Sequence, residues 1–307
     1  MRLLLQMRNV RLAIIILTAF IIFTGCSKRN VVKIGAKAIS PMLPDIVHMV
    51  MAGVNTSYGQ GMSGIPALIS LAGGLSEIDP NNYTLGWSAS QVFGATAVYN
   101  EMFNTDYASE LAWQGYRYGI RSLKTHKKFR KAIETGTPVE KAVELLPKKY
   151  VEGLTWTGMS LLVWMMMNTD DIMCISYAGE ANNLVKRACE LDGGYFYGLP
   201  HMLNALWSAM ASNLVQGCGL EPARASWAKM KEVNDGKLLL ADAYWAQLYA
   251  VAIKDRKLYK TLLTNVIEAP DDILEYRGFY ITTLAKGRAK WLLAHQEEIF
   301  MNLGTVR

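Results

Sequence analysis

The residue types that could support acid–base or metal chemistry are few and scattered in this chain. None of its four histidines has a second histidine or a cysteine at metal-ligand spacing on one predicted helix. The sequence also contains no HExxH segment, no paired CxxC segments and no GxSxG segment. A helical hydrolase acting through Glu180, Glu190 and His201 is the enzyme alternative, and it lacks a paired acid–base motif. We therefore expect no catalytic residue, no metal site and no cofactor.

Aromatic side chains form the strongest candidate for a binding cluster. Tyr195, Phe196 and Tyr197 are consecutive, and His201 and Trp207 follow them. A helix beginning near Tyr197 would place His201 on the same face, one turn later. On a concave helical surface such groups would bind a protein partner or an apolar ligand, whereas core packing between helices is the structural alternative. We take Tyr195, Tyr197, His201 and Trp207 as candidate ligand- or partner-binding residues.

A second candidate lies at Trp164, which is followed by three methionines at positions 165–167. Thioether side chains are flexible and polarizable, so beside an indole they could line an apolar passage. Packing inside a buried helix is again the structural alternative. We include Trp164 among the candidate binding residues on this basis.

A glycine-rich segment precedes Pro66. Gly59, Gly61 and Gly64 lie close together, but the segment lacks the GK[ST] ending of a phosphate loop and the strand that a dinucleotide-binding loop follows. We expect a flexible turn that leads into a helix at Pro66. A loop at a partner surface is the functional alternative.

The N-terminal residues predict an export signal. Three arginines, Arg2, Arg8 and Arg11, accompany an apolar run at residues 12–23, which is shorter than the about 20 residues of a membrane-spanning helix. Small residues and then Cys26 follow the run, as in a lipobox, where cleavage precedes the cysteine and acyl chains are attached to it. Met7 is a second candidate for the start. We expect a signal peptide at 1–25, a lipidated tether at 26–40 and a single helical domain at 41–303.

The charge of the chain changes meaning once this signal is set aside. Residues 1–25 contain three arginines and no acidic residue, so their removal lowers the formal charge from +6 to +3. The densest basic patch, residues 124–131, has no nucleic-acid recognition motif. We therefore expect no nucleic-acid partner.

The body of the chain has apolar residues at helical spacing, which predicts an all-α fold. Predicted helices alternate with short breaker segments, which favours TPR-like helix–turn–helix hairpins stacked as a short solenoid. An earlier hairpin is expected at about residues 82–101 and 104–124, and an ordinary helical bundle is the alternative. Three triplets have the spacing of the second helix of a TPR unit: Ala181–Val185–Ala188, Ala223–Trp227–Met230 and Leu258–Leu262–Asn265.

Several blocks occur in a recognisable order between about residues 42 and 300. They are GIPAL at 64–68, EIDPNN at 77–82, YASELAWQGYRYGIRSL at 107–123, RACELD at 187–192 with YFYG at 195–198, and AKGRAKWLL at 285–293. In these blocks, and in the lipobox before them, the chain resembles the TPR-like lipoproteins called TatT. These are the T components associated with tripartite ATP-independent periplasmic (TRAP) transporters. No block is a catalytic motif.

The resemblance implies a non-catalytic accessory component of a TRAP transporter. It implies an envelope location, with a lipid anchor in a membrane and the body facing the periplasm. The implied partners are the periplasmic solute-binding protein of the transporter and further copies of the chain in a homo-oligomer, a trimer. It also implies a cavity or channel through the body and a hydrophobic or organic-acid ligand, but no ligand-binding residue carries over. The alternative is a general TPR lipoprotein scaffold for envelope assembly.

Overall fold

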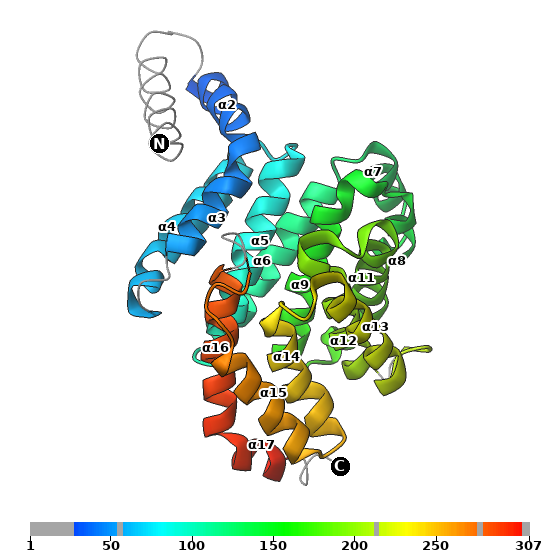
Figure 1. The fold of residues 1–307 in the computed structure, drawn as a ribbon. Helices are drawn as coiled ribbons and strands as arrows, with labels where there is room; N and C mark the ends of the chain where they lie inside the picture. Colours follow the sequence, from blue (N-terminus) through cyan, green and yellow to red (C-terminus); the bar gives the residue numbers. More distant parts are fainter. Residues whose placement is uncertain (1–27, 54–57, 212–214, 275–278, 303–307) are drawn as a thin grey trace.

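The computed structural model describes residues 28–53, 58–211, 215–274 and 279–302 of the 307-residue chain (Figure 1). Helices make up the regular structure of these ranges, and they contain no strand. The predicted all-α fold is confirmed. The expected signal peptide and the lipidation residue Cys26 lie outside the described residues.

Successive helices pair as antiparallel hairpins, as the helix–turn–helix pattern predicted. The expected early hairpin has its two helices at Tyr83–Asn100 and Thr105–Leu123. The hairpins are α5 (Tyr83–Asn100) with α6 (Thr105–Leu123), α9 (Val151–Met167) with α11 (Ala178–Asp192), α12 (Tyr195–Met210) with α13 (Leu220–Asn234), and α14 (Leu239–Trp245), extended by the π-helix η5 (Ala246–Ala250), with α15 (Arg256–Glu268).

Additional helices precede, connect and follow the hairpins. The first group is α2 (Lys28–Ile39), η1 (Ser40–Met42), α3 (Leu43–Gly53) and α4 (Tyr58–Ile78). The connectors are α7 (Lys127–Glu134), α8 (Val139–Ala142), η3 (Val143–Leu145), η4 (Lys148–Tyr150) and α10 (Ile172–Ser176). The last two helices are α16 (Phe279–Ala294) and α17 (Gln296–Asn302).

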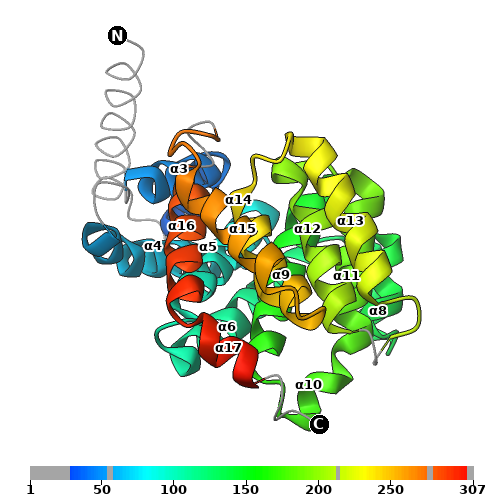
Figure 2. The ribbon, with the colours of Figure 1, turned by 60° about the horizontal axis from the view of Figure 1, so that its bottom comes forward.

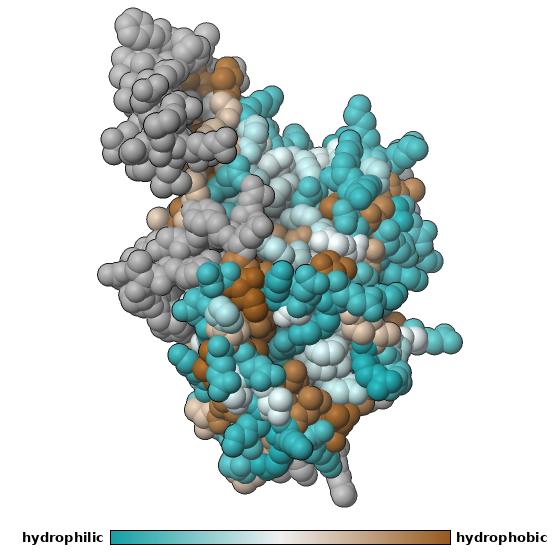
Figure 3. Space-filling model, viewed as in Figure 1, coloured by the Kyte–Doolittle hydropathy of each residue, from teal (hydrophilic) through white to brown (hydrophobic). Residues whose placement is uncertain are grey.

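The two ends of the row of hairpins meet through α16 and α3. Helix α16 packs against α14 and α15, and it also contacts α3, which in turn packs on α4 and α5. Figures 1 and 2 show α16 lying next to α3, so the end of the chain returns to its beginning. The face seen in Figure 3 is mostly hydrophilic with small apolar patches, because most apolar side chains are buried.

The glycine-rich segment differs from the expectation, and the segment predicted as a tether is helical. The glycine-rich segment is not a turn, because α4 begins at Tyr58 and continues as a helix through Pro66. Most of the expected tether, from Lys28 to Ile39, forms helix α2, which packs against α4 and buries Ala36. None of the helices that the structure describes is both long enough and apolar enough to cross a bilayer.

The TPR-like spacing holds for two of the three triplets. In α11 the residues at positions 181, 185 and 188 are fully buried, and in α13 Ala223 and Met230 are fully buried while Trp227 is half-buried. In α15 the prediction is wrong by one position, since Asn265 is exposed and the buried residues are Tyr259, Leu263 and Val266. The large ring of Tyr259 faces inward because its hydroxyl donates to the carbonyl of residue 292 in α16 (2.8 Å).

Small residues bring α5, α6 and α9 into close contact. The backbone of Gly115 on α6 approaches that of Gly94 on α5, and Oγ of Ser160 from α9 lies against both glycines. One turn further along α6, Gly119 faces Thr157, whose hydroxyl donates back to the carbonyl of residue 153 (2.5 Å). The three helices therefore pack at a separation that only small side chains allow, and they form a rigid wall for the ring.

We predict that Gly119→Ala lowers the free energy of unfolding by about 1–3 kcal/mol, because the added methyl group overlaps Oγ1 of Thr157. Gly74→Ala is the matched control, since a β-carbon on this exposed helical glycine meets no atom within 4 Å. The control should be more stable than the wild type by about 0.5–1 kcal/mol. Urea unfolding of both variants checks this, and a stabilised Gly119→Ala would contradict the close packing.

Candidate functional site

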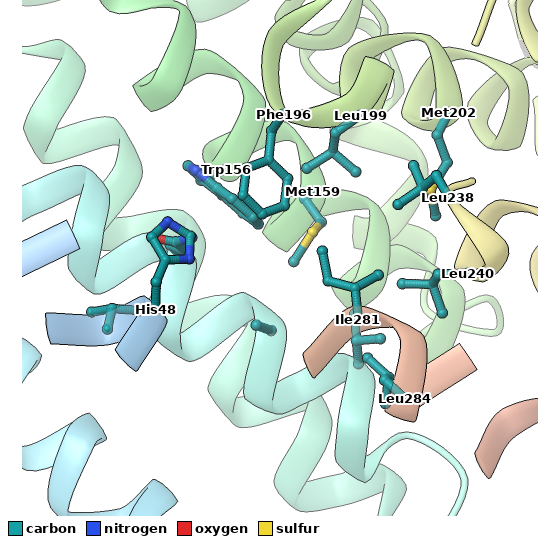
Figure 4. Close-up of a pocket in the computed structure, with 14 residues that line it drawn as sticks. His48, Trp156, Met159, Phe196, Leu199, Met202, Leu238, Leu240, Ile281 and Leu284 are labelled. Carbon is teal, nitrogen blue, oxygen red and sulfur yellow. The ribbon is translucent and has the colours of Figure 1, made fainter. Parts of the chain in front are cut away.

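The inward-facing helices of the ring enclose an apolar cavity (Figure 4). The first helix of each hairpin contributes to its wall, and α3 and α16 complete it. The lining residues are Val47, His48, Gln91, Ala95, Val98, Trp156, Met159, Phe196, Leu199, Met202, Leu238, Leu240, Ile281 and Leu284. Because the wall comes from six segments far apart in sequence, the cavity exists only in the closed ring.

The cavity is narrow for its volume. It holds about 610 Å³ of space free of protein atoms, part of it open to solvent, but the centre of a water molecule can move through only about 60 Å³. Figure 4 shows His48, Trp156 and Phe196 at one end and Leu238, Leu240 and Met202 at the other, with Met159 between them. A slender apolar molecule fits such a space better than a bulky polar one.

A second, more polar hollow adjoins the aromatic end of the cavity, and we call it the vestibule. It is lined by Pro44, His48, Trp87, Glu152, Tyr195, Phe196 and Tyr197. His48 and Phe196 line both spaces, so they stand at the boundary between vestibule and cavity. The side chains of these two residues therefore form a wall that the vestibule and the cavity share.

Phe196 is held at this boundary by its neighbours. Its ring stacks on His48 (centroids 5.7 Å apart) and meets Trp156 edge to face (5.2 Å). The indole N–H of Trp156 donates to the hydroxyl of Tyr195 (3.0 Å), which fixes the tryptophan side chain at the cavity wall. Burial raises the pKa of Tyr195, and this exceeds the lowering by the hydrogen bond from Trp156; the proximity of Glu152 raises it slightly further, so the phenol stays neutral.

The backbone at this boundary is strained. Phe196, Tyr197 and Gly198 have φ values of 46°, 60° and 80°, in the left-handed region that only glycine adopts without cost. The Asn234 side chain from α13 donates to the Tyr197 carbonyl (2.7 Å) and helps hold this conformation. The expectation of a regular helix from Tyr197 is wrong, because the right-handed helix begins only after Gly198.

This turn separates His201 from the aromatic cluster. Leu199 and Met202, which lie close to His201 in sequence, line the cavity. The His201 imidazole instead packs against Gly193, on another face of the helix. Burial, and then the nearby charge of Lys229, lower the pKa of His201. The structure therefore places Tyr195 and Tyr197 in the vestibule and His201 outside it.

The other two candidate residues lie elsewhere. Trp207 is 1% exposed, and its indole N–H donates to Oδ1 of Asn182 (3.0 Å), so it packs between α12 and α11. Trp164 is half-buried in a surface groove between α6 and α9, where its ring contacts Trp113 (4.9 Å) and Tyr177 (5.5 Å). The five predicted binding residues are thus distributed over four places, and two of them line the vestibule.

The groups proposed for hydrolytic chemistry do not converge. Glu180 and Glu190 lie ten residues apart on α11, a separation of about 15 Å along the axis. Glu180 accepts a short hydrogen bond from the buried Tyr116 hydroxyl (2.5 Å), whereas the exposed Glu190 pairs with Arg187 (3.1 Å). Within the described ranges, no cluster of three His, Cys, Asp or Glu side chains is arranged to hold a metal ion.

Sequence reasoning missed most residues of the cavity wall. Gln91, Ala95 and Val98 follow one another at helical spacing on α5, and Trp156 and Met159 do so on α9. Such stripes are indistinguishable from ordinary core stripes in a sequence. The available signal was Gln91, an amide in an apolar stripe, because a polar residue on a buried face needs a partner.

The fold and the site together define a ring of helical hairpins around an apolar cavity, with an aromatic vestibule beside it. Residues 62–300 match the family model of the TRAP transporter T-component, and this match covers most of the chain, so the chain belongs to that family. Membership assigns the protein to a transporter of the cell envelope, as an accessory component. No curated protein sequence matches the chain significantly.

We predict a pH-dependent stability that comes from Glu180. Burial raises its pKa from the ordinary 4.5 to about 7, although the Tyr116 hydrogen bond opposes the rise. Because the folded pKa is the higher one, this contribution to stability is full below about pH 4.5 and is lost as the pH rises through 7.

The wild type should therefore lose on the order of 3 kcal/mol of unfolding free energy relative to Glu180→Gln between pH 4.5 and 8. Urea unfolding at several pH values measures this difference. Glu190→Gln, on the exposed side of the same helix, should follow the pH profile of the wild type. Parallel profiles of wild type and Glu180→Gln would show that this carboxyl is not perturbed.

Proposed function

We propose that this chain is the periplasm-facing, lipid-anchored accessory component of a TRAP transporter, and that it binds the solute-binding protein of that transporter. In this proposal acyl chains on Cys26 hold it at a membrane, and homotrimers form through its helical body. Family membership over residues 62–300 supports the association with a transporter. The export signal and lipobox ahead of the helical body support the anchor.

One observation favours a role in ligand delivery over a purely structural scaffold. The ring contains an apolar cavity, and the vestibule lies directly beside it, since His48 and Phe196 line both spaces. A scaffold needs a filled core, because empty apolar space costs packing energy. A ligand passed from the solute-binding protein would enter the vestibule and occupy the cavity, and this role requires no catalytic residue.

The vestibule is the surface that a delivering partner must cover. Its tyrosines, Tyr195 and Tyr197, are half-buried, and each has an apolar ring with a polar end. Tyrosines of this kind are frequent hot spots of protein interfaces because they bury a large area at low entropy cost. The proposal therefore places the solute-binding protein over this opening, with its ligand cleft facing the cavity.

We predict that the solute-binding protein encoded beside this gene binds the full-length chain in lipid nanodiscs, with a dissociation constant of tens of micromolar or tighter. Tyr197→Ala should weaken binding about tenfold, as loss of an interface aromatic does. Tyr107→Ala is the control, since this exposed tyrosine lies at the start of α6, at the other end of the first hairpin. Surface plasmon resonance measures both, and the absence of any complex between folded partners would refute the proposal.

The anchor makes a separate prediction. When residues 1–25 are replaced by a cleavable secretory signal that does not depend on the lipobox, Cys26→Ala should release the protein from the membrane fraction, because a single acyl-bearing residue supplies the attachment. Cys218→Ala should leave the protein in the membrane fraction, since this cysteine lies within the helical body. Fractionation after cell lysis, with mass spectrometry of the N-terminal peptide, gives the result. Membrane retention of an unacylated Cys26→Ala variant would show that another contact attaches the protein.

A further inference from the structure

Helix α2 connects the proposed lipid anchor to the helical body. Ser27 alone separates Cys26 from Lys28, the first residue of α2, so the chain between these two positions spans at most about 7 Å. The helix itself has 12 residues and is therefore about 18 Å long. Acyl chains inserted in a membrane would keep the start of α2 at the membrane surface.

The residues of α2 fit such a surface. Its charged residues are Lys28, Arg29, Lys33 and Lys37, and it contains no acidic residue. One side of the helix is buried at Ala36, whereas Ile34 is 57% exposed. Lys33 and Lys37 are one turn apart and lie on the same side of the helix as Ile34. A basic helix with an exposed aliphatic side chain is typical of segments that lie among lipid headgroups.

A series of contacts places a second basic cluster at the same end of the molecule. Ser40, which follows α2, donates to the side chain of Asn82 just before α5 (2.9 Å). The ring of Tyr83 meets that of Tyr150 in η4 edge to face (centroids 4.6 Å apart), and Tyr150 also contacts His126, the residue before α7 (5.3 Å). Figure 1 shows α2 and α7 at this end, at the top of the view.

The second cluster consists of lysines on α7 and η4. Its exposed members are Lys127, Lys128, Lys131, Lys148 and Lys149. Lys148 pairs with Asp192 (3.1 Å), and the other four are in none of the ion pairs that the described residues form. Burial, and then the charges of Lys149 and Lys128, lower the pKa of His126, so positive charge is concentrated around this ring.

We call α2 together with lysines 127, 128, 131 and 149 the anchor-side surface. We infer that this surface binds the headgroups of an anionic phospholipid bilayer, with Ile34 inserted among them. The inference rests on the proposed lipid anchor and adds a second membrane contact, which orients the helical body. Its positive charge complements an anionic bilayer. Salt screens this attraction, so the acyl chains are still needed to hold the protein during fractionation at physiological salt.

The first test asks whether the acylated full-length chain lies with α7 on the membrane. A photoreactive p-benzoylphenylalanine is placed at position 127 or, as a control, at position 172. Ile172 is 81% exposed on α10, which follows the far end of α9 from η4. Each protein is illuminated in lipid nanodiscs, and mass spectrometry measures the fraction crosslinked to lipid.

Position 127 should form several times more lipid adduct in nanodiscs that contain phosphatidylglycerol than in nanodiscs of phosphatidylcholine alone. Position 172 should form little adduct in either. Position 127 lies about a hundred residues from the anchor in sequence, so proximity to Cys26 along the chain does not produce the expected adduct. Equal adduct at position 127 in the two kinds of nanodisc, or equal adduct at the two positions, would overturn the inference.

The second test measures the surface without the anchor. The unacylated Cys26→Ala chain should bind phosphatidylglycerol vesicles, and not phosphatidylcholine vesicles, in a flotation assay at about 50 mM NaCl, and should dissociate at about 500 mM. Lys128→Gln with Lys131→Gln should weaken this binding about 10- to 30-fold. The matched control is Lys257→Gln with Lys260→Gln, an exposed pair of the same spacing on α15, at the opposite end in Figure 1. It should bind as the parent chain does.

The apolar contact is tested in the same assay. Ile34→Gln should weaken vesicle binding about fivefold, because part of a buried isoleucine is lost from the bilayer. Ile172→Gln, on α10, should have no effect, and a thermal melt of every variant confirms folding. Equal binding to both kinds of vesicle, or full binding by the α7 lysine variant, would overturn the inference.

The two tests separate this inference from the proposed anchor. If Cys26 carries no acyl chain but the chain binds anionic vesicles through the lysines of α7, the anchor fails and the anchor-side surface stands. If Cys26 is acylated but neither assay depends on anionic lipid, the anchor stands and the inference fails. It also fails if the lysine variant loses affinity for the solute-binding protein and not for vesicles, since the patch then serves a protein partner.

Discussion

A buried ion pair between Arg288 on α16 and Glu101 at the end of α5 holds the ring closed. Arg288 is 2% exposed, its guanidinium lies 3.7 Å from the centroid of the Tyr244 ring, and it also donates to Gln247 in the π-helix. The Tyr244 hydroxyl donates to Glu101 (2.9 Å). Burial lowers the pKa of Arg288 to about 9, which still leaves it charged at neutral pH. A buried pair compensates its desolvation only with such additional contacts, so α5, α14 and α16 must all be in place.

The cavity is a consequence of this closure. Val98, Leu240 and Leu284 line it, and each lies about one turn before a member of the ion-pair cluster on the same helix. The same helix α5 also packs closely on α6 and α9 through glycine and serine contacts. The helix is therefore held by an ionic contact at its C-terminal end and by steric contacts along its length.

The entrance is built differently from the walls. It consists of aromatic rings around Phe196, and it depends on a left-handed backbone turn that the Asn234 side chain stabilises. Backbone strain of this kind persists only where surrounding contacts compensate it, and it is concentrated at sites that handle ligands. An apolar cavity beside a strained aromatic hollow is the feature on which the proposed role in ligand delivery rests.

The sequence alone determined the helices, their pairing into hairpins and two of the three buried TPR-like stripes, because helical periodicity depends on residues three or four positions apart. It did not reveal the ring, since Glu101 and Arg288 are far apart in the chain and a charged residue alone does not indicate burial. It also misplaced His201, because the turn at Phe196 and Tyr197 depends on a contact from α13. Periodicity therefore determined which segments fold, whereas contacts between distant segments decided which of their faces enclose a cavity.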